Sequence, residues 1–212
     1  MLNRIVTALA LALAAGPSFA VATLTVDDGT NSITVVDQGA GDANPIEGVV
    51  TVVWTSPDTL WMSTVSVGTT YPADGSPSMP YLDLNAVVTS SEAGQLTLSF
   101  TQDGFLPSNA SYASDVGGTL NENSSASFSA SADGQSISSL GPFSVAGAFA
   151  GSEVSMFANG ASPYSITLVA VIAHEGRGTS SFDYQVQVPE PGTLALFGLG
   201  LLGLGMGRMR RR

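Results

Sequence analysis

Acid–base chemistry near neutral pH has one obvious candidate in this chain. His174 is the only histidine, and it lies in the segment VIAHEGRG, shortly before Arg177. A histidine can act as a general base, but a nucleophilic triad also requires an oriented serine or cysteine. No nucleophile-elbow motif accompanies His174, and the chain has no cysteine. We therefore expect His174 to be structural, at the end of an apolar strand, and we assign no catalytic residue.

Two turn-like segments contain oxygen ligands of the kind that calcium prefers. They are Asp27, Asp28 and Asn31 in VDDGTN, and Asp37, Asp42 and Asn44 in DQGAGDAN. Calcium takes about six to eight oxygen ligands, often carboxylates from a glycine-containing loop. Neither segment matches an EF-hand or a repeated calcium-binding nonapeptide. Because tight turns require the same residue types, the sequence favours turns, and we assign no metal ligand.

Sugar binding and sugar hydrolysis would each need a different constellation. Rings exposed in a line would form a stacking surface, and the candidates are Trp54, Trp61, Tyr71, Tyr81 and Tyr112. Core packing is the favoured role for these rings. Glycoside hydrolysis requires two carboxylates facing each other at a defined separation, and in a chain so rich in acids some close pair is expected by chance.

Short blocks of alternating apolar and polar residues dominate the centre of the chain, and this period of two is typical of half-buried strands. Asp28-Gly29 between two such blocks predicts a first hairpin. The expected strands are Ala22–Asp27, Ser32–Val36, Ile46–Trp54, Leu60–Val67, Leu82–Val88, Gln95–Thr101, Ala126–Ala130, Phe143–Ala150, Tyr164–His174 and Thr179–Val188. About ten short strands separated by turns predict a single all-β domain, an antiparallel β-sandwich of jelly-roll-like type.

Two segments lack this alternation. Thr69–Tyr81 contains three prolines and predicts a loop. Residues 106–136 are poor in bulky apolar side chains, so little apolar area is available to offset the entropy of ordering them. We expect the second segment to be a mobile excursion or a weakly specified edge hairpin.

The charge balance argues against nucleic acid as a partner. Arg177 is the only Lys or Arg residue between the two terminal segments, whereas all of the 17 Asp and Glu residues except Glu190 lie there. Affinity for nucleic acid comes largely from Lys and Arg side chains that displace counterions, so we predict no nucleic-acid binding. The lack of cysteine excludes disulfides and Cys-ligated metals, and no motif indicates a cofactor.

The first 22 residues have the layout of a secretory signal peptide. Arg4 precedes an apolar run from Ile5 to Ala15, and small residues are spaced for cleavage after either Ala20 or Ala22. The run is roughly half as long as a membrane span, so we expect a cleaved helix and not a permanent anchor. We assign residues 1–22 to the signal peptide, 23–187 to the β-sandwich domain and 188–212 to a separate C-terminal segment.

The C-terminal segment reads VPEPGTLALFGLGLLGLGMGRMRRR. A proline-containing motif is followed by a glycine-rich apolar run, which predicts a transmembrane helix over about residues 193–209, and then by a charge cluster. The motif comprises Val188, Pro189, Glu190 and Pro191, and the charge cluster comprises Arg208, Arg210, Arg211 and Arg212. By the positive-inside rule the arginines stay in the cytoplasm and the domain lies outside. The signal peptide requires the same orientation.

This order of Pro-Glu-Pro motif, apolar helix and arginine cluster resembles the PEP-CTERM sorting signal of exported bacterial proteins. The resemblance implies recognition by an exosortase, a membrane-embedded enzyme of Gram-negative bacteria that make extracellular polysaccharide. The chain would be its substrate, exported by the Sec translocon, trimmed by signal peptidase, held in the inner membrane and then cleaved near the tripeptide.

We therefore expect a non-enzymatic protein of the cell surface or extracellular matrix, with exopolysaccharide or biofilm as its setting. The alternatives are a carbohydrate- or calcium-binding module and, less favoured, a polysaccharide hydrolase. Exposed rings in a line or converging acidic loops would favour the binding module. A hydrolase would need His174 or two close carboxylates at the floor of a cleft.

Overall fold

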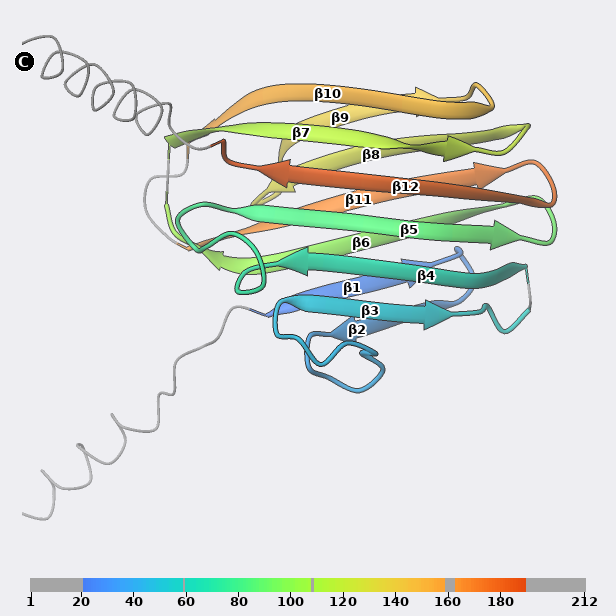
Figure 1. The fold of residues 1–212 in the computed structure, drawn as a ribbon, viewed down its shortest axis with the longest axis horizontal. Helices are drawn as coiled ribbons and strands as arrows, with labels where there is room; N and C mark the ends of the chain where they lie inside the picture. The colour runs from blue at the N-terminus through green and yellow to red at the C-terminus, as the bar shows by residue number, and fades with distance from the viewer. Residues whose placement is uncertain (1–20, 59, 108, 159–162, 190–212) are drawn as a thin grey trace, which may run out of the picture.

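The computed structural model describes residues 21–58, 60–107, 109–158 and 163–189 (Figure 1). Within these residues the chain forms twelve β-strands in two six-stranded antiparallel sheets. The strands are β1 (Ala22–Asp27), β2 (Ser32–Val36), β3 (Val49–Trp54), β4 (Trp61–Thr70), β5 (Tyr81–Ser90), β6 (Gly94–Phe105), β7 (Asn109–Leu120), β8 (Ser124–Ala132), β9 (Gln135–Phe143), β10 (Gly147–Ala158), β11 (Tyr164–His174) and β12 (Gly178–Gln187). The predicted all-β class is confirmed.

The two sheets lie face to face as the layers of a sandwich (Figure 1). The first sheet has the order β2-β1-β6-β11-β8-β9, and the second has the order β10-β7-β12-β5-β4-β3. From β5 to β8 and from β9 to β12, each strand is followed by one in the other sheet. This repeated crossing is what the jelly-roll-like prediction anticipated, and it closes one core between the layers.

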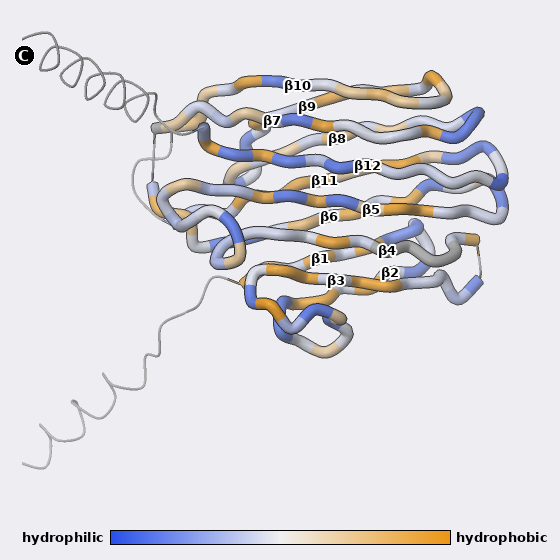
Figure 2. Tube along the Cα trace, in the orientation of Figure 1, coloured by the Kyte–Doolittle hydropathy of each residue, from blue (hydrophilic) through white to orange (hydrophobic). Residues whose placement is uncertain are grey.

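The core forms because every second residue of a strand points inward. β11 alternates buried and half-buried residues along its whole length, and Figure 2 shows hydrophobic and hydrophilic segments interleaved along both sheets. Phe128 of the first sheet packs against Phe182 and Tyr184 of the second, with ring centroids 5.2 and 5.4 Å apart. The hydroxyls of Tyr112 and Tyr164 also hydrogen-bond between β7 and β11. Aromatic contacts of this kind join the sheets into one domain.

The Ser- and Ala-rich stretch 106–136 is where the sequence prediction was partly wrong. Its first half forms β7, an interior strand between β10 and β12, and not an excursion or an edge hairpin. The predicted strand Ala126–Ala130 lies within β8, which forms a hairpin with the edge strand β9. Tyr112, Val116 and Leu120 recur every fourth residue on the inward face of β7, and all are buried. A large side chain at every second inward position is enough to hold β7 in the sheet, because the neighbouring strands contribute the other side chains of the core.

The predicted strand Phe143–Ala150 is also wrong. It straddles the end of β9, a turn at residues 144–146 and the start of β10, which lies in the other sheet. Gly147 adopts a φ of 100° where the chain crosses between the sheets. Glycine populates this region without steric cost, so the turn falls inside a pattern that otherwise resembles one strand.

The predicted proline-rich loop is confirmed at residues 71–80, between β4 and β5. Its base is closed by the Thr70 hydroxyl, which donates to the carbonyl of Tyr81 at 2.9 Å. Its tip is closed by reciprocal backbone bonds between Ser76 and Met79 at 3.0 and 3.1 Å. These bonds hold the loop in place beside the end of β12.

The described chain begins at β1 and ends after β12 at the same end of the sandwich (Figure 1). Most of the predicted signal peptide, the predicted transmembrane helix, Glu190, Pro191 and the arginine cluster lie outside the described residues. Within the described ranges no helix is long and apolar enough to cross a membrane. The assignments of those terminal segments and of the domain boundaries stay predictions.

Candidate functional site

His174 lies inside the sandwich and is only 3% exposed. Its Nδ1 is 2.7 Å from the Ser90 hydroxyl and its Nε2 is 2.8 Å from the Ser180 hydroxyl. The ring also packs against Trp61, with centroids 5.1 Å apart. Burial lowers the pKa of His174 from its ordinary value and so favours the neutral ring, whose two hydrogen bonds join the ends of β5, β11 and β12. These contacts agree with the structural role expected for it.

The acidic turns use their carboxylates to bind their own backbone. Asp28 Oδ1 accepts from the N–H groups of Thr30 and Asn31 at 2.9 and 2.6 Å. Asp42 Oδ1 accepts from the N–H groups of Asn44 and Thr51, both at 2.9 Å. One turn precedes β2 and the other follows it, so they lie at opposite ends of this strand and do not converge. Among the described residues no group of three or more His, Cys, Asp or Glu side chains is placed to hold a metal ion.

The aromatic residues do not form an exposed line. Trp61 and Tyr112 are fully buried and Trp54 is nearly so, which makes them part of the core. Tyr71 and Tyr81 are half-buried, and Tyr81 points outward from the first position of β5. The tryptophans thus give no support to a stacking surface. Of the five candidate rings, Tyr81 is the one that lies on the outer face of a sheet.

That outer face of the second sheet carries a row of polar side chains that we call the acidic strip, defined as Asp83 of β5, Asp183 and Gln185 of β12, and Asp115 of β7. Gln185 pairs with Asp83 on one side and with Asp115 on the other, which places all three on the same face. Asp183 lies two residues from Gln185 and therefore faces Asp83 diagonally. Three neighbouring strands thus bring three carboxylates together.

Asp83 is the most perturbed group of the strip. Burial, followed by the negative charge of Asp183 and a hydrogen bond with it, raises the pKa of Asp83 to about 7. Its Oδ1 is buried and has no hydrogen-bond partner in the structure. At neutral pH the strip therefore holds a partly protonated carboxyl group, which can both donate and accept a hydrogen bond.

A hollow of about 240 Å³ lies over Gly117, at the end of the acidic strip on β7. Asp115, Asp183 and Gln185 line it together with Gly117 and Val116. A Cβ atom on Gly117 would meet only one atom within 4 Å, the carbonyl oxygen of Phe149 at 3.8 Å. The missing side chain thus leaves open space flanked by two carboxylates and an amide, which we call the Gly117 hollow.

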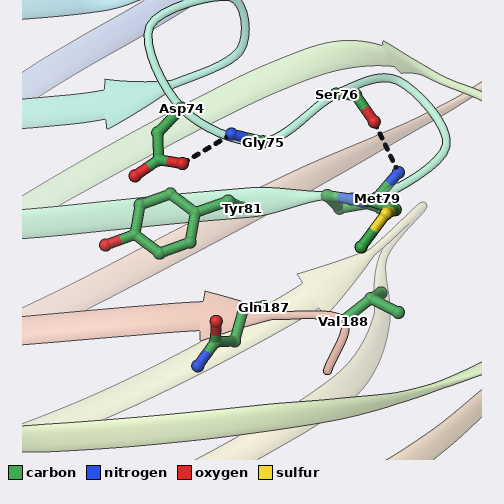
Figure 3. A pocket seen from close by; sticks show the side chains of 8 residues that line it. Asp74, Gly75, Ser76, Met79, Tyr81, Gln187 and Val188 are labelled. Carbon is green, nitrogen blue, oxygen red and sulfur yellow. Dashed lines mark hydrogen bonds between the residues drawn. The ribbon is translucent and has the colours of Figure 1, made fainter. Parts of the chain in front are cut away.

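A second depression, of about 280 Å³, lies at the other end of the strip and is called here the Tyr81 pocket. Figure 3 shows the Tyr81 ring between the Asp74 carboxylate and the Gln187 side chain, with Met79 and Val188 nearby. Asp74 also accepts from the N–H of Gly75 at 2.7 Å, and the N–H of Val188 donates to the carbonyl of Pro80 at 3.0 Å. The pocket thus combines an aromatic and apolar wall with an amide and a carboxylate.

Tyr81 stays protonated in this setting. Burial and the nearby charges of Asp83, Asp74 and Asp183 raise the pKa of Tyr81 to about 12. Its hydroxyl donates to Gln185 Oε1 at 3.4 Å and so connects the Tyr81 pocket to the acidic strip. The two depressions and the strip therefore form one continuous polar surface across β5, β12 and β7.

Sequence reasoning named Tyr81 but missed the rest of this surface. Asp83 and Asp183 lie in different predicted strands, and only the register between β5 and β12 brings them together. The available signal was the polar residue at every second position in YLDLN and in FDYQVQ. It identifies outward-facing residues without revealing which strands are neighbours.

Fold and site together define a single β-sandwich domain with an acidic, hollowed sheet face, followed by a C-terminal segment of a different kind. Residues 187–212 match the family model of the PEP-CTERM protein-sorting motif. The predicted resemblance is confirmed, and the chain carries the sorting signal of an exported protein that an exosortase processes. Within that motif, Val188 and Pro189 continue directly from β12.

No curated protein matches the sequence. Among solved structures, a carbohydrate-binding module described for specific mannan recognition is similar at 13% identity and a TM-score of 0.29, covering 66% of this chain and 98% of that one. A structure of infectious bursal disease virus, Gx strain, is similar at 11% identity and a TM-score of 0.26, covering 82% of this chain and 53% of that one. Likenesses this weak carry no argument about function.

Proposed function

We propose that the exported domain is a non-enzymatic protein of the cell surface or matrix that holds a polysaccharide chain against the outer face of its second sheet. The observation that carries this proposal is the continuous surface from the Tyr81 pocket through the acidic strip to the Gly117 hollow. Sugars present C–H faces that pack on rings, and hydroxyls that bond to amides and carboxylates. This surface offers both.

The dimensions of the surface favour a polymer over a single sugar. From Gln187 to Asp183 the path runs four residues along β12, or about 13 Å. From β5 to β7 it crosses two strand spacings, or about 10 Å. Each depression, at about 240 and 280 Å³, is smaller than the ~300–1,000 Å³ typical of small-molecule sites and suits one ring of a longer chain.

We further propose that the domain has no enzymatic activity. Both ring nitrogens of His174 are engaged by serine hydroxyls in the core, so the histidine has no access to substrate. The carboxyl pair Asp83 and Asp183 lies on the outer face of a sheet. Hydrolysis by two carboxyl groups needs them to flank the bond to be cleaved at the floor of a cleft, whereas a polar sheet face supports binding alone.

Affinity electrophoresis or calorimetry of segment 21–188 with the producing bacterium's own exopolysaccharide tests the proposal, with and without calcium. The two sheets and their core lie within that segment. Tyr81→Ala and Gln187→Ala should each weaken binding about tenfold, as loss of a central contact does. Gln135→Ala is the matched control, because Gln135 is an exposed glutamine on the other sheet. No binding, or equal loss in the control, would overturn the proposal.

The N-terminal region supports one of the two predicted signal-peptidase positions. Ala22 is fully buried in β1, and its carbonyl accepts from the N–H of Asp37 at 2.9 Å. The nitrogen of Val21 lies 2.7 Å from Asp103 Oδ1. Cleavage after Ala20 would place a new positive α-amino group against that carboxylate, whereas cleavage after Ala22 would remove a core residue. We expect the mature protein to start at Val21.

Intact-mass analysis of the exported protein measures both ends. A mature chain that starts at Thr23, or that keeps the terminal arginines after export, would contradict the proposed processing. Asp103→Asn, which removes the partner of the new amino group, should leave the cleavage position unchanged, because it alters only the folded product.

A further inference from the structure

The four edge strands of the sandwich differ in how they are protected. Natural sheets blunt their edges with short strands, covering loops, prolines or bulges, because an open edge pairs with other chains. β2 has only five residues. The edge of β3 is covered at Thr51, whose carbonyl accepts from Ala43 N–H and whose N–H donates to Asp42. β9 contains Pro142 and two register shifts against β8.

β10 is long and lacks proline, bulges and, in the described part of the chain, a covering loop, and its one charged residue, Glu153, bonds to the N–H of Ser139 in β9. It has 12 residues with the sequence GAFAGSEVSMFA, without proline, lysine or arginine, and it pairs with β7 in unbroken register along its whole length. Val154 and Met156 are 71% and 76% exposed. Within the described residues, none of the loop or turn hydrogen bonds involves a backbone group of β10. Figure 1 shows β10 along one outer margin of the second sheet.

We propose that β10 pairs antiparallel with β10 of a second copy, about a two-fold axis at Ser152. A two-fold axis perpendicular to the sheet keeps outward residues opposite outward residues. Centred on Ser152, it places Ala150 opposite Val154 and Ala148 opposite Met156. Each exposed large side chain then faces a small one, and nearly the whole of both strands is paired. Shifting the axis by two residues in either direction shortens the pairing and loses this match.

The charges of this acidic protein permit the pairing. Glu153 is the only charged residue of β10, and its carboxylate accepts from the N–H of Ser139 at 2.8 Å. In the proposed register it faces Gly151 of the second copy, and the two Glu153 residues are diagonal neighbours about 7–8 Å apart, each with its carboxylate bonded to Ser139 of its own copy. Asp115 pairs with Ser152, so the two Asp115 residues would lie three strand spacings apart, about 14 Å. That separation exceeds the ~8–10 Å screening length at physiological salt.

Two observations favour a second copy over another partner strand. The outward side chains of β10 are small at one end, at Ala148 and Ala150, and large at the other, at Val154 and Met156. A second β10 running antiparallel places its large side chains opposite the small ones, whereas an unrelated strand has no such order of sizes. An exposed row of uncharged side chains in a chain of formal net charge −11 also gives two copies a surface on which they can approach without opposing like charges.

A single introduced cysteine tests the register directly, because the chain has none of its own. In Ser152→Cys two thiols would face each other across the axis at a Cα separation of about 4.5–5.5 Å, within the range that a disulfide spans. Non-reducing electrophoresis of segment 21–188 should then show a dimer that reductant dissolves. Val53→Cys is the matched control, because Val53 is 63% exposed on the opposite edge strand of the same sheet.

A second variant tests the interaction without cross-linking. Val154→Lys places an inserted charge opposite Ala150 and should weaken dimerisation in sedimentation equilibrium by about tenfold or more, whereas Val53→Lys should not change it. Circular dichroism confirms that each variant is folded. A protein that stays monomeric at millimolar concentration would overturn the proposal. A dimer that is unaffected by Val154→Lys and is not cross-linked in Ser152→Cys would also overturn it. The same holds for a monomer that pairs only with an unrelated strand.

Discussion

Replacing Asp83 by asparagine should stabilise the folded domain at alkaline pH. The pKa of Asp83 rises from the ordinary 3.8 to about 7 on folding, a difference of about three pH units at about 1.36 kcal/mol each. The ionised carboxyl therefore costs the native state at most about 4 kcal/mol above pH 7. Partial solvation screens part of this cost, so we expect Asp83→Asn to raise the free energy of unfolding by about 2 kcal/mol at pH 8.

The pH dependence separates this explanation from better packing. Below pH 7 the folded wild-type protein takes up the proton, while the unfolded chain stays ionised until about pH 3.8. The cost therefore shrinks as the pH falls, and the advantage of Asp83→Asn should be no more than about 1 kcal/mol at pH 4.5 and be lost near pH 3. Because Asp183 is the second cause of the shift, adding Asp183→Asn should contribute little more.

Urea unfolding at pH 8 and 4.5 measures these differences, followed by the fluorescence of the buried Trp54 and Trp61. Glu92→Gln is the control, because it removes one negative charge from an exposed turn. The reasoning is refuted if the Asp83→Asn variant is no more stable than the wild type at pH 8. It is also refuted if the variant gains the same free energy of unfolding at both pH values.

Three further changes test the core and the turns by the same unfolding assay. His174→Ala should cost about 2–4 kcal/mol, because it removes two buried hydrogen bonds and leaves a cavity; an unchanged stability would exclude the structural role. Gly68→Ala should cost about 1–3 kcal/mol, since its Cβ would lie 2.4 Å from the Phe100 ring, whereas Gly176→Ala, with no atom within 4 Å, should stay within about 0.5 kcal/mol. Asp42→Ala should cost about 1–3 kcal/mol, because the Asp42 carboxylate accepts hydrogen bonds from three backbone N–H groups. Calcium should not shift the melting temperature of the wild-type protein, and a calcium-dependent shift would support the metal-site alternative.

The sequence predicted strands well where large and polar residues alternate without interruption. The predicted strand Tyr164–His174 coincides with β11, whose inward positions carry Ile166, Leu168 and Ile172. The prediction failed for β7 because serine, alanine and glycine at most of its positions carry little hydrophobic signal. Its neighbours in the sheet decide its conformation, and they come from β10 and β12, which are distant in sequence.

The sorting signal could be predicted from the sequence alone, whereas the acidic strip could not. The signal is linear, because its motif, apolar run and arginines are read in order along one segment, and a single sequence is enough to identify it. The strip depends on pairing between residues such as Asp83 and Gln185, which lie about a hundred positions apart. Strand register is not encoded in any local pattern of one chain, so the site required the structure.

The two proposals together make a quantitative claim about polymer binding. An axis perpendicular to the second sheet leaves both acidic strips on the same side of the dimer, so one long chain can contact both. The second contact is then intramolecular, and avidity should raise the affinity for long polysaccharide by at least about tenfold over that for short oligosaccharides. Val154→Lys, which splits the dimer without touching either strip, should remove this advantage while leaving short-oligosaccharide affinity unchanged. If it lowered both affinities equally, the edge of β10 would belong to the sugar site, and the separation of binding face from assembly edge would be wrong.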